Sequence, residues 1–187
     1  MKTKSGSKIT KRFLSAKNSL NQLRLHCKLK ISRLVYTGDF LVDENLLLNM
    51  PIRLEGSGSI KLGKSVSVGY GRAPKMGNGE ILLQTRSDTA SIEIGSGSVL
   101  SNNLSIICSE SILIGERCLI GDFASIIDSD FHDINPSKRH TATGETKPVV
   151  LEENVWVGSR AMIMKGVTIG KKQRYRGWSG CHENDPT

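Results

Sequence analysis

A regular spacing of aliphatic residues runs through most of the chain. An aliphatic residue recurs every six positions, often followed by glycine, and a column of small or aliphatic residues lies two positions before it. The first column holds only leucine, isoleucine or valine, at Leu62, Val68, Ile94, Leu100, Ile106, Ile114, Ile120, Ile126, Leu151, Val157, Ile163 and Ile169. The period of two within each hexad predicts a short strand, and the closing glycine predicts a turn with unusual backbone dihedrals.

A strand and a turn every six residues cannot bury an apolar face alone, so the units must stack on copies of themselves. Three hexads make a triangular coil, and successive coils lie about 4.8 Å apart. The pattern therefore predicts an all-β solenoid with an aliphatic ladder inside, clearest over residues 58–170. Cys108, Cys118 and Ala124 lie beside or in this ladder, and we interpret them as packing residues rather than nucleophiles. An antiparallel β-sandwich is the structural alternative, but it gives no reason for strict sixes.

Charge separates the N-terminal arm from this body. The chain has 187 residues and a net charge of +8, yet residues 1–33 contain ten Lys or Arg and no Asp or Glu. The arm, residues 1–35, could contact anionic lipid or nucleic acid. It could also be a solvated helix, which we favour, that packs on the body through Phe13, Leu14, Leu20, Leu23 and Leu25. A nucleic-acid reader would carry interleaved aromatic residues, so we expect no nucleic-acid partner and leave peripheral membrane contact open.

Other composition features favour a cytoplasmic location. No apolar run approaches the length of a membrane span, and no signal peptide precedes the body. The cysteines show no CxxC spacing, so a disulfide framework or structural zinc is not expected, and a reducing compartment fits. They are Cys27, Cys108, Cys118 and Cys181.

Two segments carry a resemblance to a known family. "SILIGERCLIGDFASIID" and "PVVLEENVWVGSRAMIMKGVTIG" resemble the left-handed β-helix acyltransferases with hexapeptide repeats. They are most similar to the branch that acetylates sugar hydroxyls, which includes O-antigen, capsule and galactoside acetyltransferases. The resemblance implies a left-handed parallel β-helix over residues 36–170 and a homotrimer with active sites between subunits. It also implies acetyl-CoA as the donor and a carbohydrate acceptor from bacterial surface-polysaccharide biosynthesis.

A polar insertion, residues 127–148, interrupts the ladder between Ile126 and Leu151 and is expected to form a surface loop. His132 lies near its start. Nearby carboxylates are Asp128, Asp130 and Asp133. Acyl transfer to an alcohol needs a base, and a histidine whose tautomer is fixed by a carboxylate or carbonyl suits that role. The family places its catalytic histidine in this loop, so the resemblance implies that His132 is the base. The residues alone leave open a solvated surface histidine, our interpretation of His140.

The resemblance also assigns donor and acceptor contacts. In "NVWVGS", Trp156 and Ser159 match family positions beside the pantetheine arm of acyl-CoA, although Trp156 alone could be a rim aromatic. "NNLSIICSESILIGE" aligns with the stretch that lines the sugar pocket of galactoside-type members. The family has an acidic pair where this chain has Cys108 and Ser109, so the identity of the acceptor does not carry over. The expected acceptor contacts are Ser101, Asn103, Ser109 and Asp130.

Other functions fit the sequence less well. Zinc carbonic anhydrases share the fold but need three converging histidines. Besides the two loop histidines, the chain has only His26 in the arm and His182 near its end, so we expect no metal. A nucleotidyltransferase fusion is not supported, because this sequence contains no glycine-rich phosphate loop. A non-catalytic β-helix, as a degenerate enzyme or an assembly scaffold, stays open as the alternative.

The six-residue spacing stops after Gly170. Family members continue with hexads of the form "NSVIGAGAVVTK", whereas this chain reads "KQRYRGWSGCHENDPT". Codons chosen for that segment yield "NSVIGAGAVVTK" when one adenine is deleted near Lys171. We therefore expect residues 171–187 to be an aberrant, frameshifted tail that could impair the enzyme, and we assign no role to Trp178, Cys181 or His182.

Overall fold

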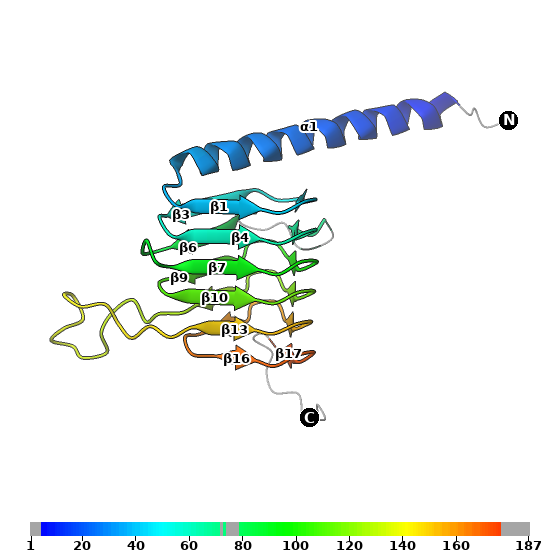
Figure 1. Ribbon diagram of the computed structural model, residues 1–187. Helices are drawn as coiled ribbons and strands as arrows, with labels where there is room; N and C mark the ends of the chain where they lie inside the picture. The colour runs from blue at the N-terminus through cyan, green and yellow to red at the C-terminus, as the bar shows by residue number, and fades with distance from the viewer. Residues whose placement is uncertain (1–4, 72, 74–78, 177–187) are drawn as a thin grey trace.

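The computed structural model describes residues 5–71, 73 and 79–176, with side chains described from Asn18 onward. One long helix, α1 (Ser5–Val35), precedes a stack of short strands (Figure 1). The first sheet contains β1 (Asp39–Val42), β4 (Ser59–Leu62), β7 (Ser91–Ile94), β10 (Ser111–Ile114), β13 (Val149–Leu151) and β16 (Thr168–Ile169). The second contains β2 (Leu47–Leu48), β5 (Ser67–Val68), β8 (Val99–Leu100), β11 (Leu119–Ile120), β14 (Trp156–Val157) and β17 (Arg174–Tyr175). The third contains β3 (Ile52–Gly56), β6 (Ile81–Thr85), β9 (Ser105–Cys108), β12 (Ser125–Ile127) and β15 (Met162–Ile163).

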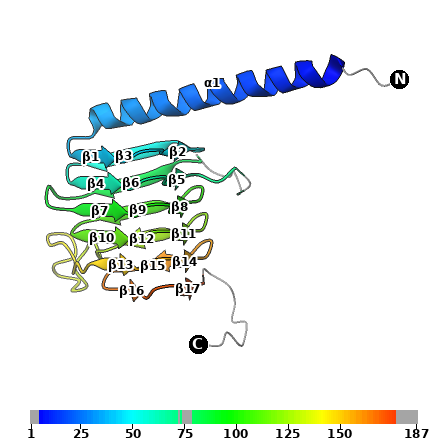
Figure 2. The same cartoon turned by 45° about the vertical axis from the view of Figure 1, so that its right-hand side comes forward.

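Each strand pairs in parallel with the equivalent strand of the next coil. In the first sheet, for example, Ile92 pairs with Ile112, and Ile112 pairs with Val149. The coils wind in a left-handed sense down the stack, as Figure 2 shows from a second angle. This arrangement confirms the left-handed parallel β-helix and excludes the antiparallel sandwich. The first coil, β1 to β3, lies before the segment in which the spacing is clearest, but its Val42, Leu48 and Leu54 are also six residues apart.

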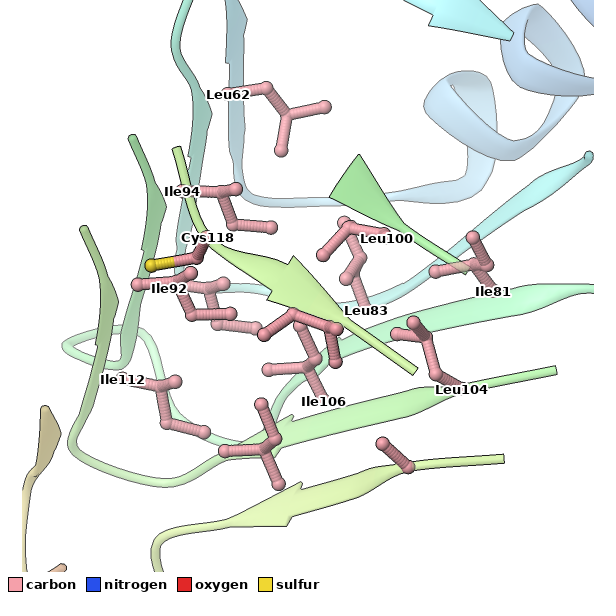
Figure 3. Packing of buried hydrophobic residues seen from close by; sticks show 14 of the residues in the cluster. Leu62, Ile81, Leu83, Ile92, Ile94, Leu100, Leu104, Ile106, Ile112 and Cys118 are labelled. Carbon is pink, nitrogen blue, oxygen red and sulfur yellow. The ribbon is translucent and has the colours of Figure 1, made fainter. Parts of the chain in front are cut away.

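The interior is the predicted aliphatic ladder. All twelve residues of the first column are buried, and the most exposed, Ile169, is only 6% accessible. Figure 3 shows members from successive coils pointing into the same central space. Cys118 and Ala124 are buried in the second column, as their small size predicts. Burial, with the neighbouring Asp128 carboxylate, raises the pKa of the buried Cys108 thiol to about 12, so this cysteine stays protonated and is no nucleophile.

Most of the glycines that end the hexads serve a different purpose from the one expected. Gly69 has the expected positive φ, 83°, but at other corners positive φ falls on non-glycine residues such as Arg117 and Phe123, with φ values of 55° and 56°. Most hexad glycines are needed because adjacent coils approach closely. A Cβ on Gly121 would lie 2.4 Å from the Ser159 backbone nitrogen, and one on Gly115 would lie 2.7 Å from the Glu152 carbonyl carbon. Steric room between stacked coils therefore selects glycine at these positions.

Helix α1 lies across the N-terminal end of the solenoid and packs on β2 and β3. Leu25 is buried there, the Ser32 hydroxyl accepts a 2.7 Å hydrogen bond from the Leu54 backbone nitrogen, and the Tyr36 hydroxyl donates to the Gly58 carbonyl at 2.8 Å. The packing expected of the other arm residues is wrong for Leu20 and Leu23, which are 68% and 63% exposed because they face away from the coils. Phe13 and Leu14 lie outside the described side chains. No helix in the described part of the chain has the length and apolar character needed to cross a bilayer.

The last described residues extend the solenoid beyond Gly170. Arg174 and Tyr175 form β17, which pairs in parallel with Trp156 and Val157 of β14. Residues 171–176, expected to belong to the aberrant tail, therefore continue the last coil. The rest of the predicted tail, with Trp178, Cys181 and His182, lies outside the described residues.

Candidate active site

The loop between β12 and β13 leaves the solenoid at the corner between the third and first sheets, which we call the loop corner (Figure 1). Its two ends are held together as a short antiparallel ladder. The Lys147 backbone nitrogen donates to the Asp128 carbonyl at 2.9 Å, the Asp130 nitrogen donates to the Glu145 carbonyl at 3.0 Å, and Ser129 bridges Thr146. These contacts fix the direction in which the loop leaves the rigid coils.

Asp128 anchors the base of the loop to the coil above. The carboxylate is fully buried and accepts three backbone N–H bonds, from Ser109 at 2.7 Å, Glu110 at 2.8 Å and Ser111 at 2.9 Å. The Cys108 thiol donates a fourth bond at 3.3 Å. Three successive N–H groups directed at one carboxylate form an anion nest, here filled by the protein itself. Asp128 is therefore part of the scaffold that positions the loop.

Lys165 holds the loop from the coil below. Its ammonium group lies 3.2 Å from the Asp130 carboxylate and also pairs with Glu145. Hydrogen bonds from Lys147 and Lys165 lower the pKa of the exposed Glu145 carboxyl from 4.5 to about 2. Hydrogen bonds with Glu145 and Asp130 raise the pKa of Lys165. Asp130, expected to contact the acceptor, thus lies in this ion-pair cluster at the foot of the loop.

We expect acid to release this ion-pair cluster. Because the folded-state pKa of Glu145 is depressed, its contribution is fully present above pH 4.5 and is lost as the pH falls from 4.5 towards 2. Hydrogen exchange of residues 130–146, corrected for intrinsic rates, should rise through this window. Lys165→Met should show the fast exchange already at pH 6, whereas Lys138→Met, in the same loop, should not. Equal exchange in the two variants at pH 6 would contradict the prediction.

His132 lies on the loop with its ring exposed and its tautomer defined. The ring Nδ1 atom is 3.1 Å from the Arg139 carbonyl oxygen. A carbonyl can only accept, so Nδ1 carries the proton and Nε2 keeps its lone pair. Of the two partners considered from the sequence, the structure supplies a carbonyl and not one of the nearby carboxylates. Gly144 permits this fold of the loop, because a Cβ there would lie 2.4 Å from the His132 carbonyl oxygen.

The other predicted site residues lie in two separate places. Ser109 is at the loop corner, between β9 and β10, beside the buried Asp128. Ser101, Asn103, Trp156 and Ser159 lie at or near the opposite end of the third sheet, which we call the Trp156 corner. Asn103 and Ser109 flank β9 and are six residue steps apart, which span about 20 Å at about 3.3 Å per residue. One chain therefore does not bring the predicted donor contacts to His132.

The Trp156 corner presents polar and aromatic side chains on neighbouring coils. Trp156 is 49% exposed, and the Arg174 guanidinium lies 5.3 Å from its ring centroid. The Ser159 hydroxyl donates to the Asp122 carboxylate of the coil above. Asn103 accepts a 2.8 Å bond from the Gly79 nitrogen, while its own amide nitrogen is buried and has no hydrogen-bond partner among the described residues. This corner can thus offer hydrogen-bond donors and an aromatic surface to a long, polar ligand.

Sequence reasoning missed several residues that shape these two places. No sequence motif marks the Arg139 carbonyl, Lys165 or Asp128 as the carboxylate in the anion nest. Each of these roles depends on contacts between coils or across the loop. Asp122 had a weak signal, since it stands one coil before Ser159 at the same position of the repeat. A separate surface hollow, which includes Asp43, Lys61, Glu93 and Glu116 in its lining, contains none of the predicted site residues.

Comparison with known proteins supports the interpretation of the six-residue spacing as a hexapeptide repeat. Residues 148–172 match the family described as the hexapeptide repeat of succinyl-transferase. The chain is 31% identical over 80 residues to galactoside O-acetyltransferase of Lactococcus lactis subsp. lactis (strain IL1403), covering 43% of this chain and 38% of that protein. It is 32% identical over 77 residues to nodulation protein L of Rhizobium meliloti (strain 1021), covering 41% and 42%.

A solved structure also aligns with the chain. The crystal structure of the polySia-specific acetyltransferase NeuO superposes with a TM-score of 0.48 and 18% identity, covering 75% of this chain and 76% of that one. The chain spans about two fifths of the length of the two sequence relatives. The sequence similarities confirm the predicted resemblance to sugar O-acetyltransferases with hexapeptide repeats.

Proposed function

We propose that the chain is an O-acetyltransferase that moves an acetyl group from acetyl-CoA to a sugar hydroxyl. The observation that carries this proposal is His132, whose Nδ1 donates to the Arg139 carbonyl and whose Nε2 is left free as a base. The similarity to galactoside O-acetyltransferase, named for such a reaction, supports it. We further propose a carbohydrate of bacterial surface-polysaccharide biosynthesis as the acceptor, and the cytoplasm as the location, in keeping with the free Cys27, Cys108 and Cys118.

In this mechanism His132 first accepts a proton from the acceptor hydroxyl and then donates it to the leaving thiolate. Nε2 accepts the proton of the acceptor hydroxyl as its oxygen attacks the thioester carbonyl carbon. Backbone N–H groups of the coils stabilise the resulting oxyanion. The carbon–sulfur bond then breaks, and the imidazolium returns its proton to the leaving thiolate. The Arg139 carbonyl, bound to Nδ1–H, stabilises the imidazolium that forms between the two transfers.

We propose that the working unit is a homotrimer, because the two halves of the site lie on different corners of one chain. A neighbouring subunit that placed its Trp156 corner against the loop corner would bring Trp156 and Ser159 towards His132. Acyl-CoA would then lie in the groove between subunits, with Trp156 and Ser159 beside its pantetheine arm and Ser101, Asn103, Ser109 and Asp130 towards the acceptor. The wide separation of the corners supports this arrangement.

Subunit mixing tests whether the site is shared. We expect His132→Ala and Ser159→Arg to be nearly inactive alone, the first without its base and the second with a blocked groove. After the two variants are unfolded together and refolded, some interfaces pair an intact loop with an intact Trp156 corner, so acetyl transfer should return. No recovery in a mixture shown by native mass spectrometry to contain mixed trimers would place the whole site on one chain.

The alternative is a non-catalytic β-helix, either a degenerate enzyme or a scaffold. Calorimetry with acetyl-CoA and release of free thiol in the presence of a panel of glycans separate the two functions. An enzyme should bind the donor and release thiol only when an acceptor is present. A trimer that neither binds acetyl-CoA nor releases thiol would favour the alternative.

A further inference from the structure

Helix α1 has two apolar faces, and the coils cover only one of them. The covered face contains the buried Leu25 with the half-buried Leu29 and Ser32. Successive residues turn by about 100°, so Leu23 and Leu34 lie about 160° to 180° around the helix from Leu25. The outward face contains four large aliphatic side chains between 62% and 84% exposed: Leu20, Leu23, Ile31 and Leu34. A helix that only capped the solenoid would need no such second face.

Positive charge borders this outward face on both sides. The same helical spacing places Arg24 and Lys28 along one edge and Lys30 and Arg33 along the other. Of these, Lys28 lies 4.0 Å from Glu80, while no ion pair involves Arg24 or Lys30 among the described side chains. The first acidic residue of the whole chain is Asp39. The helix therefore presents an aliphatic stripe between two basic edges, with no negative charge of its own.

We propose that the outward face of α1 is a docking surface for an anionic phospholipid membrane. Aliphatic side chains would enter the boundary between headgroups and acyl chains, while Lys and Arg at the edges would contact the phosphates. Charge decides against a second copy of the helix as the occupant. Two copies would bring ten positive charges each into contact with no carboxylate between them, whereas coiled-coil partners pair opposite charges along their edges.

The position of the helix fits this use. Figure 1 shows α1 lying across the end of the solenoid and extending past the coils, and Figure 2 shows the same overhang from another side. Its outward face is directed away from the coils, so the solenoid axis would point away from the bilayer. If the proposed trimer forms with parallel solenoids, three such helices lie at one end of the assembly and bind the surface together.

Vesicle co-sedimentation of the full-length chain tests the proposal. We expect strong binding to vesicles of phosphatidylcholine with about 30 mol % phosphatidylglycerol, and weak binding to phosphatidylcholine alone. Leu23→Gln with Leu34→Gln removes two aliphatic contacts and should weaken binding about tenfold or more. Arg24→Gln with Lys30→Gln should weaken it about 25-fold, at roughly 1 kcal/mol per basic residue near the surface, and reduce its salt dependence.

A matched control lies at the other end of the solenoid. Lys171→Gln with Lys172→Gln removes the same charge far from α1 and should leave vesicle binding unchanged. All variants should have the circular dichroism spectrum of the unaltered chain and its rate of acetyl transfer to a soluble acceptor. A failure of this proposal can therefore be distinguished from a failure of the proposed function. Binding that ignores phosphatidylglycerol, or that is unchanged in the double leucine variant, would overturn it. A larger oligomer that forms in the unaltered chain and is lost in the double leucine variant would also overturn it. So would binding of duplex DNA that is equally strong in the unaltered chain and in the double leucine variant. In either case the occupant would not be a membrane.

Discussion

Replacing His132 with alanine is expected to lower the rate of acetyl transfer by about two to four orders of magnitude, the usual contribution of a general base. The reason is the free Nε2 of a ring whose other nitrogen is bound to the Arg139 carbonyl. Thiol release from acetyl-CoA, measured with a saturating acceptor, reports the change in kcat. Binding of acetyl-CoA by calorimetry should stay within about threefold of the unaltered protein, because the base acts on the acceptor and not on donor affinity.

The control for this experiment is His140→Ala. His140 lies on the same loop and is exposed, so its loss should leave the rate almost unchanged. Added imidazole should restore part of the activity of His132→Ala, because it can replace the missing base, and should not affect His140→Ala. Equal rates for the two alanine variants would remove His132 as the base. A lower rate in both, with no rescue by imidazole, would mean that the loop and not the ring is required.

The sequence predicted the interior of this protein well because the repeat is a packing pattern. Each ladder position must be aliphatic to fill the space between sheets, so Ile106 or Ile163 can be assigned to the core from spacing alone. The same spacing continues in β1 to β3, where Val42, Leu48 and Leu54 are six residues apart, so the first coil falls inside the domain expected from residue 36. Periodicity misjudged Leu20 and Leu23, because it does not say which face of a helix is covered.

The candidate site was less accessible to sequence reasoning. The resemblance could name His132, but the Arg139 carbonyl is a backbone group with no sequence signature. Spacing also could not show that Ser109 and Asn103 stand at opposite ends of one strand and so cannot both face His132 within a chain. These relations arise when coils stack and the loop folds back, which depends on contacts between residues far apart in sequence.

Asp128 shows how a single buried carboxylate connects the coils to the loop. Its two oxygens accept from the backbone nitrogens of Ser109, Glu110 and Ser111, the turn that leads from β9 to β10. Its own backbone carbonyl accepts from Lys147 and closes the base of the loop. Removing the side chain therefore leaves donors without a partner inside the protein, and this is more costly than losing a neutral hydrogen bond at the surface.

We expect Asp128→Ala to lower the free energy of unfolding by about 3 to 5 kcal/mol, the largest stability loss among the carboxylates near the loop. Asp128→Asn should cost less, because its amide oxygen still accepts one or two of the three N–H bonds while its NH₂ group faces the others. Asp133→Ala is the matched control: Asp133 accepts one local bond, from the Asn135 nitrogen at 2.7 Å, and its loss should cost about 1 kcal/mol. Urea unfolding followed by circular dichroism measures all three, and an unchanged slope shows that the shift in midpoint reflects stability. If Asp128→Ala unfolds at the same urea concentration as Asp133→Ala, water replaces the carboxylate at little cost, and Asp128 does not hold the turn to the loop.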